Sequence, residues 1–497
     1  MYIKQTEFQE AGLQRLRPLG SRVGILGVGH ATYWPQFEGL LEQLQQELAV
    51  FEQKVQAGAA GVEVFNFGIS DSPEAAYRAL ERIRAANLDL LFVDMLTYAT
   101  SSTIACIFQA TRLPIVLVAL QPDPALDYAR ATTHLQLYND DICALPEFAS
   151  VAVRMGRSVP PMIIGTLQDD PQAEAEIRRY CQIANVLHSL QRARIGQMGH
   201  VLEAMLDMHT DSTLLTATFG CHLVQLEVDD LFRHYRATSA DQIEARKAEI
   251  LGFFDTPDPG ADPITGKLTG RDLEEAARVS SALHRFVEEK HLDGLAYYYE
   301  AEAGSERRRL VSNLIVGNSI LTGRGFPMCG EMDLKTCIAM LIMDRLEMGG
   351  SFAEFHPVDF REGFVLVGHD GPHHIRIAEG KPVLRSLKKY HGKPGAGASV
   401  EFQLRAGPIT MLGITQRADG RFKFVIAEGE SRKGPIPATG NTNTRGFFQP
   451  DVRTFLKRWF AEGPTHHFAL GLGHRAADLK AVGDFLGVES AIVNTKV

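Results

Sequence analysis

The sequence lacks the features that would place this protein in a membrane or outside the cell. It has only six cysteines in 497 residues, spread from Cys106 to Cys337, and no two of them form a CxxC pair. Such scattered cysteines are typical of free thiols in a reducing compartment rather than of a disulfide framework. No apolar run approaches the roughly 20 residues of a membrane helix, and the first twelve residues contain no apolar signal core. We therefore expect a cytoplasmic protein that does not enter the membrane.

Clustered positive charge is also scarce. The net charge is −9, and the densest basic run, Arg307-Arg308-Arg309, is short enough to be a solvated helix face. Nucleic-acid binding normally requires a basic patch, so we expect no nucleic-acid partner. With 45% hydrophobic and 22% charged residues, the composition is that of an ordinary globular protein. The length predicts two to four domains.

The first third of the chain alternates short apolar runs with amphipathic stretches. Strands are predicted at residues 23–26, 62–65, 90–93 and 114–118. One of the intervening helices is predicted at residues 36–57, and the alternation indicates a parallel sheet covered on both faces. Ligands of such sheets bind beyond the carboxyl ends of the strands, so loops with His30, Asp94 and Gln121 should form the functional edge. The loop Gly27-Val28-Gly29 lacks the third glycine of a dinucleotide fingerprint and is better interpreted as a tight turn.

A second α/β unit is predicted from residue 162, with a helix at residues 239–252. Further strands in it are predicted at residues 214–217 and 295–299. After about residue 350 the alternation becomes antiparallel in character, with a hairpin turn at Asp419-Gly420. Strands are predicted there at residues 364–367, 374–377, 400–404, 409–412 and 422–426.

The predicted fold class is therefore α/β, with two doubly wound parallel-sheet domains followed by a C-terminal antiparallel β-barrel-like domain. The expected boundaries are 1–160, 161–328 and 329–497, and the last domain carries the candidate ligands.

Two carboxylates and a set of imidazoles in this last domain suggest a divalent metal site that stays partly open to substrate. Glu331 precedes a helix predicted from residue 334, where an acid could simply complement the helix dipole. Glu354 lies between aromatic neighbours that indicate burial, and a buried carboxylate needs a partner. His369 ends a predicted strand, where a hydrogen-bonded loop histidine is the alternative. In the pair His466-His467 adjacent side chains diverge, so only one of them is expected to ligate.

Four segments resemble motifs of L-arabinose isomerases, in the same order and with similar spacing. Residues 330–336 resemble GEGDWKTA, residues 350–354 resemble TSFMED, residues 366–369 resemble LGSHM, and residues 464–467 resemble GAHH. The chain is thus similar to the arabinose/fucose isomerase superfamily. The resemblance implies three domains, a hexamer with its sites at subunit boundaries, and metal ligation by Glu331, Glu354, His369 and His467. It also implies that the two glutamates move protons and that His30 and His466 contact the sugar.

The chemistry of aldose–ketose isomerisation suits these residue types. A divalent ion chelated by two sugar oxygens polarises the carbonyl and stabilises the enediolate, while two carboxylates serve as base and acid. Mixed oxygen and imidazole ligation with room for two more oxygens favours Mn²⁺, with Co²⁺ or another divalent ion as the alternative. The family motifs are altered at Gly29-His30, Ala119-Leu120, Leu334 and Phe355. These positions are expected on the sugar-contacting edge, so the identity of the sugar stays open.

The sequence therefore predicts a metal-dependent aldose–ketose isomerase that acts on a free sugar, L-arabinose-like or a related aldose, through a cis-enediolate. Two alternatives remain: a non-catalytic sugar-binding or regulatory homologue, and an epimerase that uses the same metal site. The presence of all four candidate metal ligands argues against the non-catalytic alternative, because a protein that has lost its activity has no physical need to keep them. The expected partners are a small sugar and further copies of the chain, as a trimer or hexamer.

Overall fold

The computed structural model describes residues 13–494 except 203, 259–264, 388, 391–392, 395–396 and 438–441. The first twelve residues, in which a signal core was sought, lie outside this part. The chain divides into two compact units, Pro18–Ser189 and a larger one made of Met1–Arg17 with Leu190–Val497. The division into three domains at residues 160 and 328 stays a prediction.

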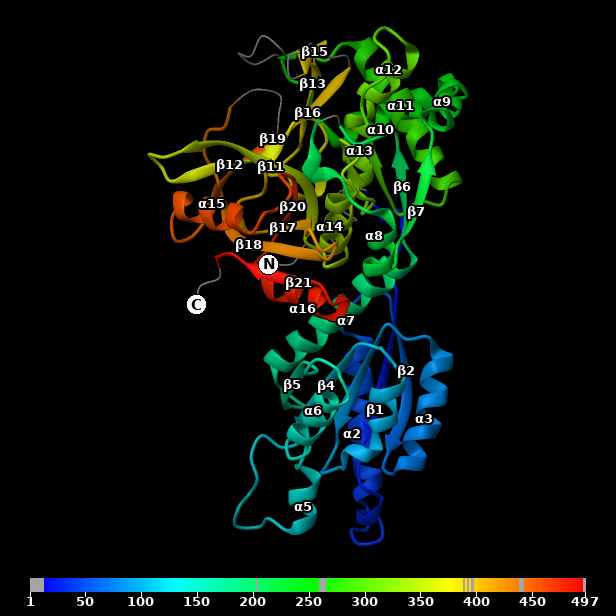
Figure 1. Ribbon diagram of the computed structural model, residues 1–497, viewed down its shortest axis with the longest axis vertical. Helices are drawn as coiled ribbons and strands as arrows, with labels where there is room; N and C mark the ends of the chain where they lie inside the picture. The colour runs from blue at the N-terminus through cyan, green and yellow to red at the C-terminus, as the bar shows by residue number, and fades with distance from the viewer. Residues whose placement is uncertain are drawn as a thin grey trace. The chain divides into compact units, whose positions relative to one another are not determined.

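The unit Pro18–Ser189 is built on a five-stranded parallel sheet with the order β2-β1-β3-β4-β5 (Figure 1). Its strands are β1 (Ser21–Val28), β2 (Val62–Ser70), β3 (Leu90–Met95), β4 (Ile115–Gln121) and β5 (Met162–Thr166). Its helices are α2 (Leu40–Gln56), α3 (Pro73–Ala86), α4 (Ala105–Ala110), α5 (Thr133–Tyr138), α6 (Leu145–Arg154) and α7 (Pro171–Arg192), which continues past the boundary. Helices α3, α4 and α6 share a core with one face of the sheet. On the other face, Phe51 of α2 packs edge-on against Phe92 of β3, so the predicted doubly wound arrangement is confirmed.

The strand order makes β1 and β3 neighbours, and their carboxyl ends form the edge at which the winding changes direction. His30 follows β1, and its ring centroid lies 5.2 Å from that of Tyr33 and 6.3 Å from that of Tyr98. Asp94, near the end of β3, is only 4% exposed. Burial, reinforced by the nearby charge of Glu47, raises the pKa of this carboxyl to about 8.

The larger unit contains a second parallel sheet, with the order β10-β9-β6-β7, and helices packed against it. The strands are β6 (Arg194–Met198), β7 (His222–Leu226), β9 (Gly294–Tyr297) and β10 (Met328–Cys329). The helices are α8 (Ser212–Phe219), α9 (Val228–Arg236), α10 (Ala240–Phe253), α11 (Gly270–Glu289), α12 (Glu306–Ser312), α13 (Leu314–Gly323) and α14 (Leu334–Arg345).

The C-terminal part of this unit is a closed barrel of six antiparallel strands with the order β17-β20-β11-β12-β19-β18, closed by pairing of β17 with β18. The strands are β11 (Gly349–Asp359), β12 (Phe364–His369), β17 (Gly407–Gln416), β18 (Phe422–Arg432), β19 (Thr442–Phe447) and β20 (Phe468–Leu472). Helices α15 (Val452–Ala461) and α16 (Ala476–Leu486) follow, and β21 (Glu489–Ile492) adds to β18 in parallel. The predicted antiparallel barrel is confirmed.

Two small sheets complete this unit. The strands β8 (Thr265–Gly266), β13 (Val383–Leu387) and β16 (Ala398–Glu401) form one of them, and β14 (Lys389–Tyr390) with β15 (Lys393–Pro394) form the other.

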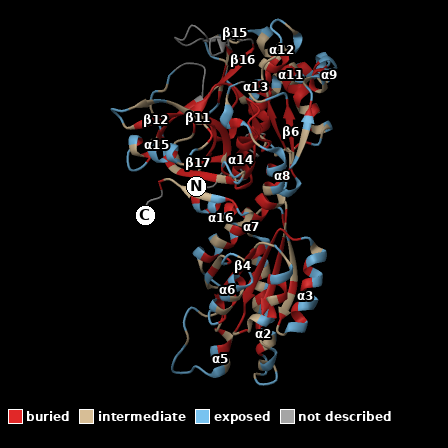
Figure 2. Cartoon of the chain, in the orientation of Figure 1, coloured by how far each residue is buried: buried red, intermediate tan, exposed pale blue. Residues whose placement is uncertain are grey.

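Helix α14 joins the second sheet to the barrel, because it packs against β9 on one side and against β11, β17 and β20 on the other. All twelve of its residues are buried, and Figure 2 shows buried red around α14. The sequence predicted this helix, but the helix ends at Arg345 rather than at Gly349-Gly350, which begin β11. Its N-terminus therefore opens at the junction between the sheet and the barrel, where the candidate ligands lie.

Two strand predictions were wrong, and a third predicted strand lies in a sheet other than the barrel. Residues 214–217 belong to helix α8, which is capped by Asp211 and buries Leu215 and Phe219 at helical spacing. Residues 374–377 form a 3-10 turn, η4 (Ile375–Ile377), in which both apolar residues and the intervening Arg376 are buried. The segment predicted at residues 400–404 contributes to β16, which lies in a small sheet with β13 and β8 rather than in the barrel.

No helix in the described part of the chain is both long and apolar enough to span a bilayer. All six cysteines are free, as the scattered pattern predicted, and five of them are buried.

Replacing the buried acid Asp94 should remove a pH dependence of stability. The folded protein keeps this proton up to about pH 8, whereas an unfolded aspartate loses it near about 3.9. The folded state therefore binds more protons within this window, and stability falls as the pH rises through it. Asp94→Asn does not titrate, so its stability relative to the parent should increase from pH 5 to pH 8, by roughly 1.4 kcal/mol per pH unit.

Thermal unfolding of the two proteins at several pH values measures this difference. The exposed acid Asp127 of the same unit provides the control variant Asp127→Asn. Parallel pH profiles for Asp94→Asn and the parent would contradict the assignment.

Candidate metal centre

The entry into helix α14 holds Glu331 in an unusual backbone conformation. Glu331 and Met332 both have φ of 58°, in the left-handed region that side chains other than glycine rarely adopt. The turn is held by a hydrogen bond of 2.9 Å from the Met332 N–H to the Tyr297 carbonyl at the end of β9. Asp333 then caps the helix, because its carboxylate accepts from the N–H and the hydroxyl of Thr336. Two strained residues before a fixed cap are typical of a functional site.

His467, immediately before β20, lies between two of these acids. Its Nδ1 is 3.2 Å from Asp333 Oδ2, and its Nε2 is 3.4 Å from Glu331 Oε2. Burial alone lowers the pKa of this imidazole, but the hydrogen bond to Asp333 and the nearby carboxylates outweigh it, so the pKa is raised. A histidine whose Nδ1 is held by a carboxylate presents Nε2 in a fixed direction, as metal-ligating histidines do.

Glu354 and His369 enter from the hairpin formed by β11 and β12. Glu354 pairs in register with Gly368, and its carboxylate lies 3.9 Å from His369 Nε2. His369 Nδ1 is 2.8 Å from the Asp370 carbonyl, which leaves Nε2 as the available nitrogen. Burial, together with the neighbouring His467, holds the pKa of His369 well below its usual value. The neutral imidazole that results is the form that binds metals.

The ring of Phe352 packs against both histidines and brings these two pairs together. Its centroid lies 4.4 Å from that of His369 and 4.3 Å from that of His467, and the two histidine rings are 5.3 Å apart. The four predicted ligands are therefore brought together, although they come from the N-terminus of α14, two barrel strands and the loop before β20.

His466 lies beside Glu331 and His467. Ligand atoms of Glu331, His466 and His467 are all within 4.8 Å of one another. The Nδ1 of His466 is 2.6 Å from Asp207 Oδ2. Partial burial raises the pKa of Asp207, but the two hydrogen bonds from His466 bring it below its usual value. The predicted sugar contact His30 belongs to the unit Pro18–Ser189, at the edge described above.

The residues fit a divalent cation. Glu331 Oε2 is buried, lies 3.4 Å from His467 Nε2 and makes no hydrogen bond with any described residue, although a buried carboxylate oxygen without a hydrogen bond is costly. Burial raises the pKa of Glu331, with the His467 and His466 charges opposing and Glu354 adding to the rise. A cation would satisfy this oxygen, and a mixed set of carboxylates and imidazoles suits Mn²⁺ or a similar ion.

Three further residues near the candidate ligands were not predicted from the sequence: Asp333, Lys335 and Asp207. Asp333 had a recognisable signal, because an aspartate followed three residues later by threonine at the start of an apolar helix is a typical cap. Asp207, 259 residues before His466, had none.

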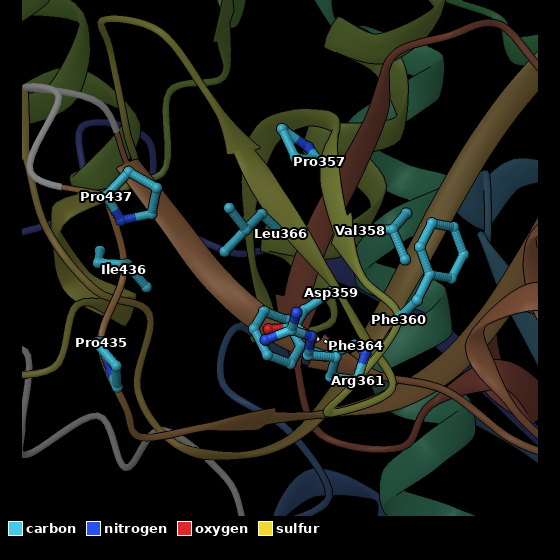
Figure 3. A pocket seen from close by; sticks show the side chains of 10 residues that line it. All are labelled: Pro357, Val358, Asp359, Phe360, Arg361, Phe364, Leu366, Pro435, Ile436 and Pro437. Atoms are coloured by element: carbon cyan, nitrogen blue, oxygen red, sulfur yellow. Dashed lines mark hydrogen bonds between the residues drawn. The ribbon is translucent and has the colours of Figure 1, made fainter.

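A cavity of about 570 Å³ lies at the other end of the β11–β12 hairpin (Figure 3). Its lining includes the exposed Phe360 at the hairpin tip and Pro435 of the segment after β18. None of the candidate ligands lines it, so the hollow is separate from the metal centre.

Comparisons with known proteins agree on one group of enzymes. Residues 381–493, which contain His466 and His467 but not the two glutamates, match the family model for the L-fucose isomerase C-terminal domain. An L-arabinose isomerase from Nocardioides sp. is 25% identical over 83% of this chain and 84% of its own length. Another L-arabinose isomerase, from Aeromonas hydrophila, is 23% identical over 70% of this chain and 68% of its own length. A sulfoquinovose isomerase from Priestia aryabhattai is 18% identical over 85% of this chain and 90% of its own length.

Similarity to solved structures is too slight to bear on function. A conserved domain protein from Vibrio cholerae is 11% identical, with a TM-score of 0.17 over 62% of this chain and 73% of that chain.

Replacing Asp333 by asparagine should weaken metal binding without unfolding the helix. Asparagine still caps α14, but the carboxylate that orients His467 is lost. Loss of such a partner typically reduces metal affinity by about 10–100-fold. Calorimetric titration of metal-free Asp333→Asn with Mn²⁺ measures the change. Asp359→Asn, in the β11–β12 turn, is the control, and equal affinities for the two variants would show that Asp333 does not support the metal.

Proposed function

Because the chain belongs to the arabinose/fucose isomerase superfamily, we propose that it is a metal-dependent aldose–ketose isomerase acting on a free sugar. The observation that carries the proposal is the buried Glu331 oxygen without a hydrogen-bond partner, 3.4 Å from His467 and within the same group as His369 and Glu354. The site combines metal ligands with carboxylates that can carry protons, and a purely sugar-binding protein needs neither.

Glu331, Glu354, His369 and His467 would hold the ion, Mn²⁺ or Co²⁺ in the first instance. The ion supplies a Lewis acid that polarises the sugar carbonyl and favours the enediolate. Phe352 covers the two histidine rings and keeps water from that side of the site. Asp333 keeps the Nδ1 of His467 occupied, so that its Nε2 stays directed at Glu331.

The two glutamates would carry the protons of the isomerisation. The reaction removes a proton from the carbon beside the carbonyl and returns one to the neighbouring carbon, through a cis-enediolate. Glu331 is buried, whereas the side chain of Glu354 is 25% exposed. The two carboxylates therefore differ in environment, which is what an acid and a base in one site require. Either can take the first proton, depending on which face of the sugar is presented.

We propose that the substrate is an uncharged aldose related to L-arabinose. Lys335 is the cationic residue closest in sequence to Glu331. Its ammonium already donates to three backbone carbonyls. It is therefore not available to pair with a sulfonate or a phosphate. We further propose that the protein works as a homo-oligomer, trimer or hexamer, and that His30 and His466 contact the sugar.

Glu331→Gln and Glu354→Gln should each lower turnover by about 10²–10⁴-fold, because each removes a proton-transfer group. Turnover is measured on a panel of pentoses, hexoses and deoxy sugars with the metal content of every preparation determined. Glu430→Gln, at an exposed position of β18, is the control. Either active-site variant turning over as fast as the parent would refute the assigned role.

Product analysis by NMR in deuterated water separates the alternatives. An isomerase yields a ketose from an aldose, with deuterium at one carbon. An epimerase yields a second aldose, and a non-catalytic homologue binds sugar without metal dependence and forms no product.

A further inference from the structure

A lysine inside the protein fixes the loop that carries Asp207. Lys335 is fully buried, and its Nζ lies 3.0, 2.9 and 3.3 Å from the carbonyl oxygens of Asp207, Met208 and His209. Only an ammonium has three N–H donors, so the three contacts together indicate the protonated side chain. Because the three acceptors are consecutive, they hold the 3-10 turn η3 (Leu206–Met208) and the residue after it in one conformation.

Asp207 in turn holds His466 at two points. Its Oδ2 accepts the backbone N–H of His466 at 2.9 Å and is 2.6 Å from His466 Nδ1. Because Asp207 contacts both the backbone N–H and the ring Nδ1 of His466, the rotation of the imidazole is fixed. The other ring nitrogen, Nε2, lies on the opposite edge of the ring. The ring then lies 3.8 Å, between centroids, from that of His467.

The N-terminus of α14 therefore controls both histidines of the pair. Asp333 holds His467 directly, and Lys335, two residues later, acts on His466 through the loop of Asp207. The side chain of His466 is 35% exposed, so without Asp207 the ring contact with His467 would be its main remaining described contact.

We propose that Asp207 is a positioning residue of the isomerase, which orients His466 toward the bound sugar. The inference rests on the proposed function, since it assigns a sugar contact to His466 while His467 ligates the metal. Asp207 touches neither substrate nor ion, and its effect reaches the reaction only through His466. Its loss should therefore weaken sugar binding and leave both metal content and the chemical step nearly unchanged.

A double-mutant cycle tests whether Asp207 acts through His466. Asp207→Ala should raise KM roughly tenfold with little change in kcat, the size expected for one charge-assisted hydrogen bond. In a His466→Ala background the same substitution should have no further effect. Asp207→Asn should restore part of the loss, because its amide oxygen still accepts an N–H from His466. An equal loss in both backgrounds would overturn the proposal.

Two controls separate positioning from other roles. Asp211→Ala changes the same loop at an exposed helix cap and should leave KM unchanged. Metal analysis of Asp207→Ala should match the parent, and a loss of metal would instead make His466 a ligand and overturn the proposal.

Crystal structures of the parent and Asp207→Ala give a result that needs no turnover. We expect the His466 ring to be displaced or disordered while His467 stays in place, and an unmoved His466 would overturn the inference. A parent without activity on any sugar would refute the proposed function, whereas these structures would still decide the role of Asp207.

Discussion

Helix α14 has no face toward solvent, so every polar group that it carries must find a partner inside the protein. At its C-terminal end, Asp344 is surrounded by Arg15, Arg345 and Arg376. At its N-terminal end, Asp333 is satisfied by Thr336 and His467, and Lys335 by three carbonyls. Removing one member of such a buried set leaves an unpaired charge, which costs far more than the pair contributes. The hydrogen bonds and ion pairs that satisfy the buried polar groups of α14 therefore also fix the geometry of the site.

The residues of the candidate site come from two places in the fold, the β11–β12 hairpin and the junction between the second sheet and the barrel. The barrel hairpin brings Glu354 and His369 together, because Glu354 pairs with Gly368, the residue before His369, and the Glu354 carboxylate lies 3.9 Å from His369 Nε2. The junction with the second sheet delivers Glu331 in a left-handed conformation that only a fixed surrounding can maintain. The pKa values of the two imidazoles that meet between them are shifted in opposite directions. Burial holds the pKa of His369 well below its usual range, whereas Asp333 raises that of His467 against the effect of burial.

Much of the fold followed from patterns that act over short stretches of chain. Apolar runs alternating with helices predicted the first sheet, and helical spacing from Leu334 predicted α14. The errors arose where an apolar segment was short. Residues 214–217 fit a strand and a helix equally well until the Asp211 cap and the burial of Leu215 with Phe219 decide between them. At residues 374–377, Arg376 is buried rather than turned to solvent, because Asp344 is available to it inside the core.

The sequence by itself determined the order of the elements, the types of ligand and the resemblance to sugar isomerases, since motif order and local periodicity are written along the chain. Only the tertiary structure decided that the predicted ligands Glu331, Glu354, His369 and His467 lie close together. It also decided that Asp333 and Asp207 contact the two adjacent histidines and that Lys335 binds the loop of Asp207. Asp207 and His466 are 259 residues apart, and no local preference links them. Their contact exists because the buried Lys335 must satisfy three donors, and that requirement appears only after the sheet and the barrel have packed around α14.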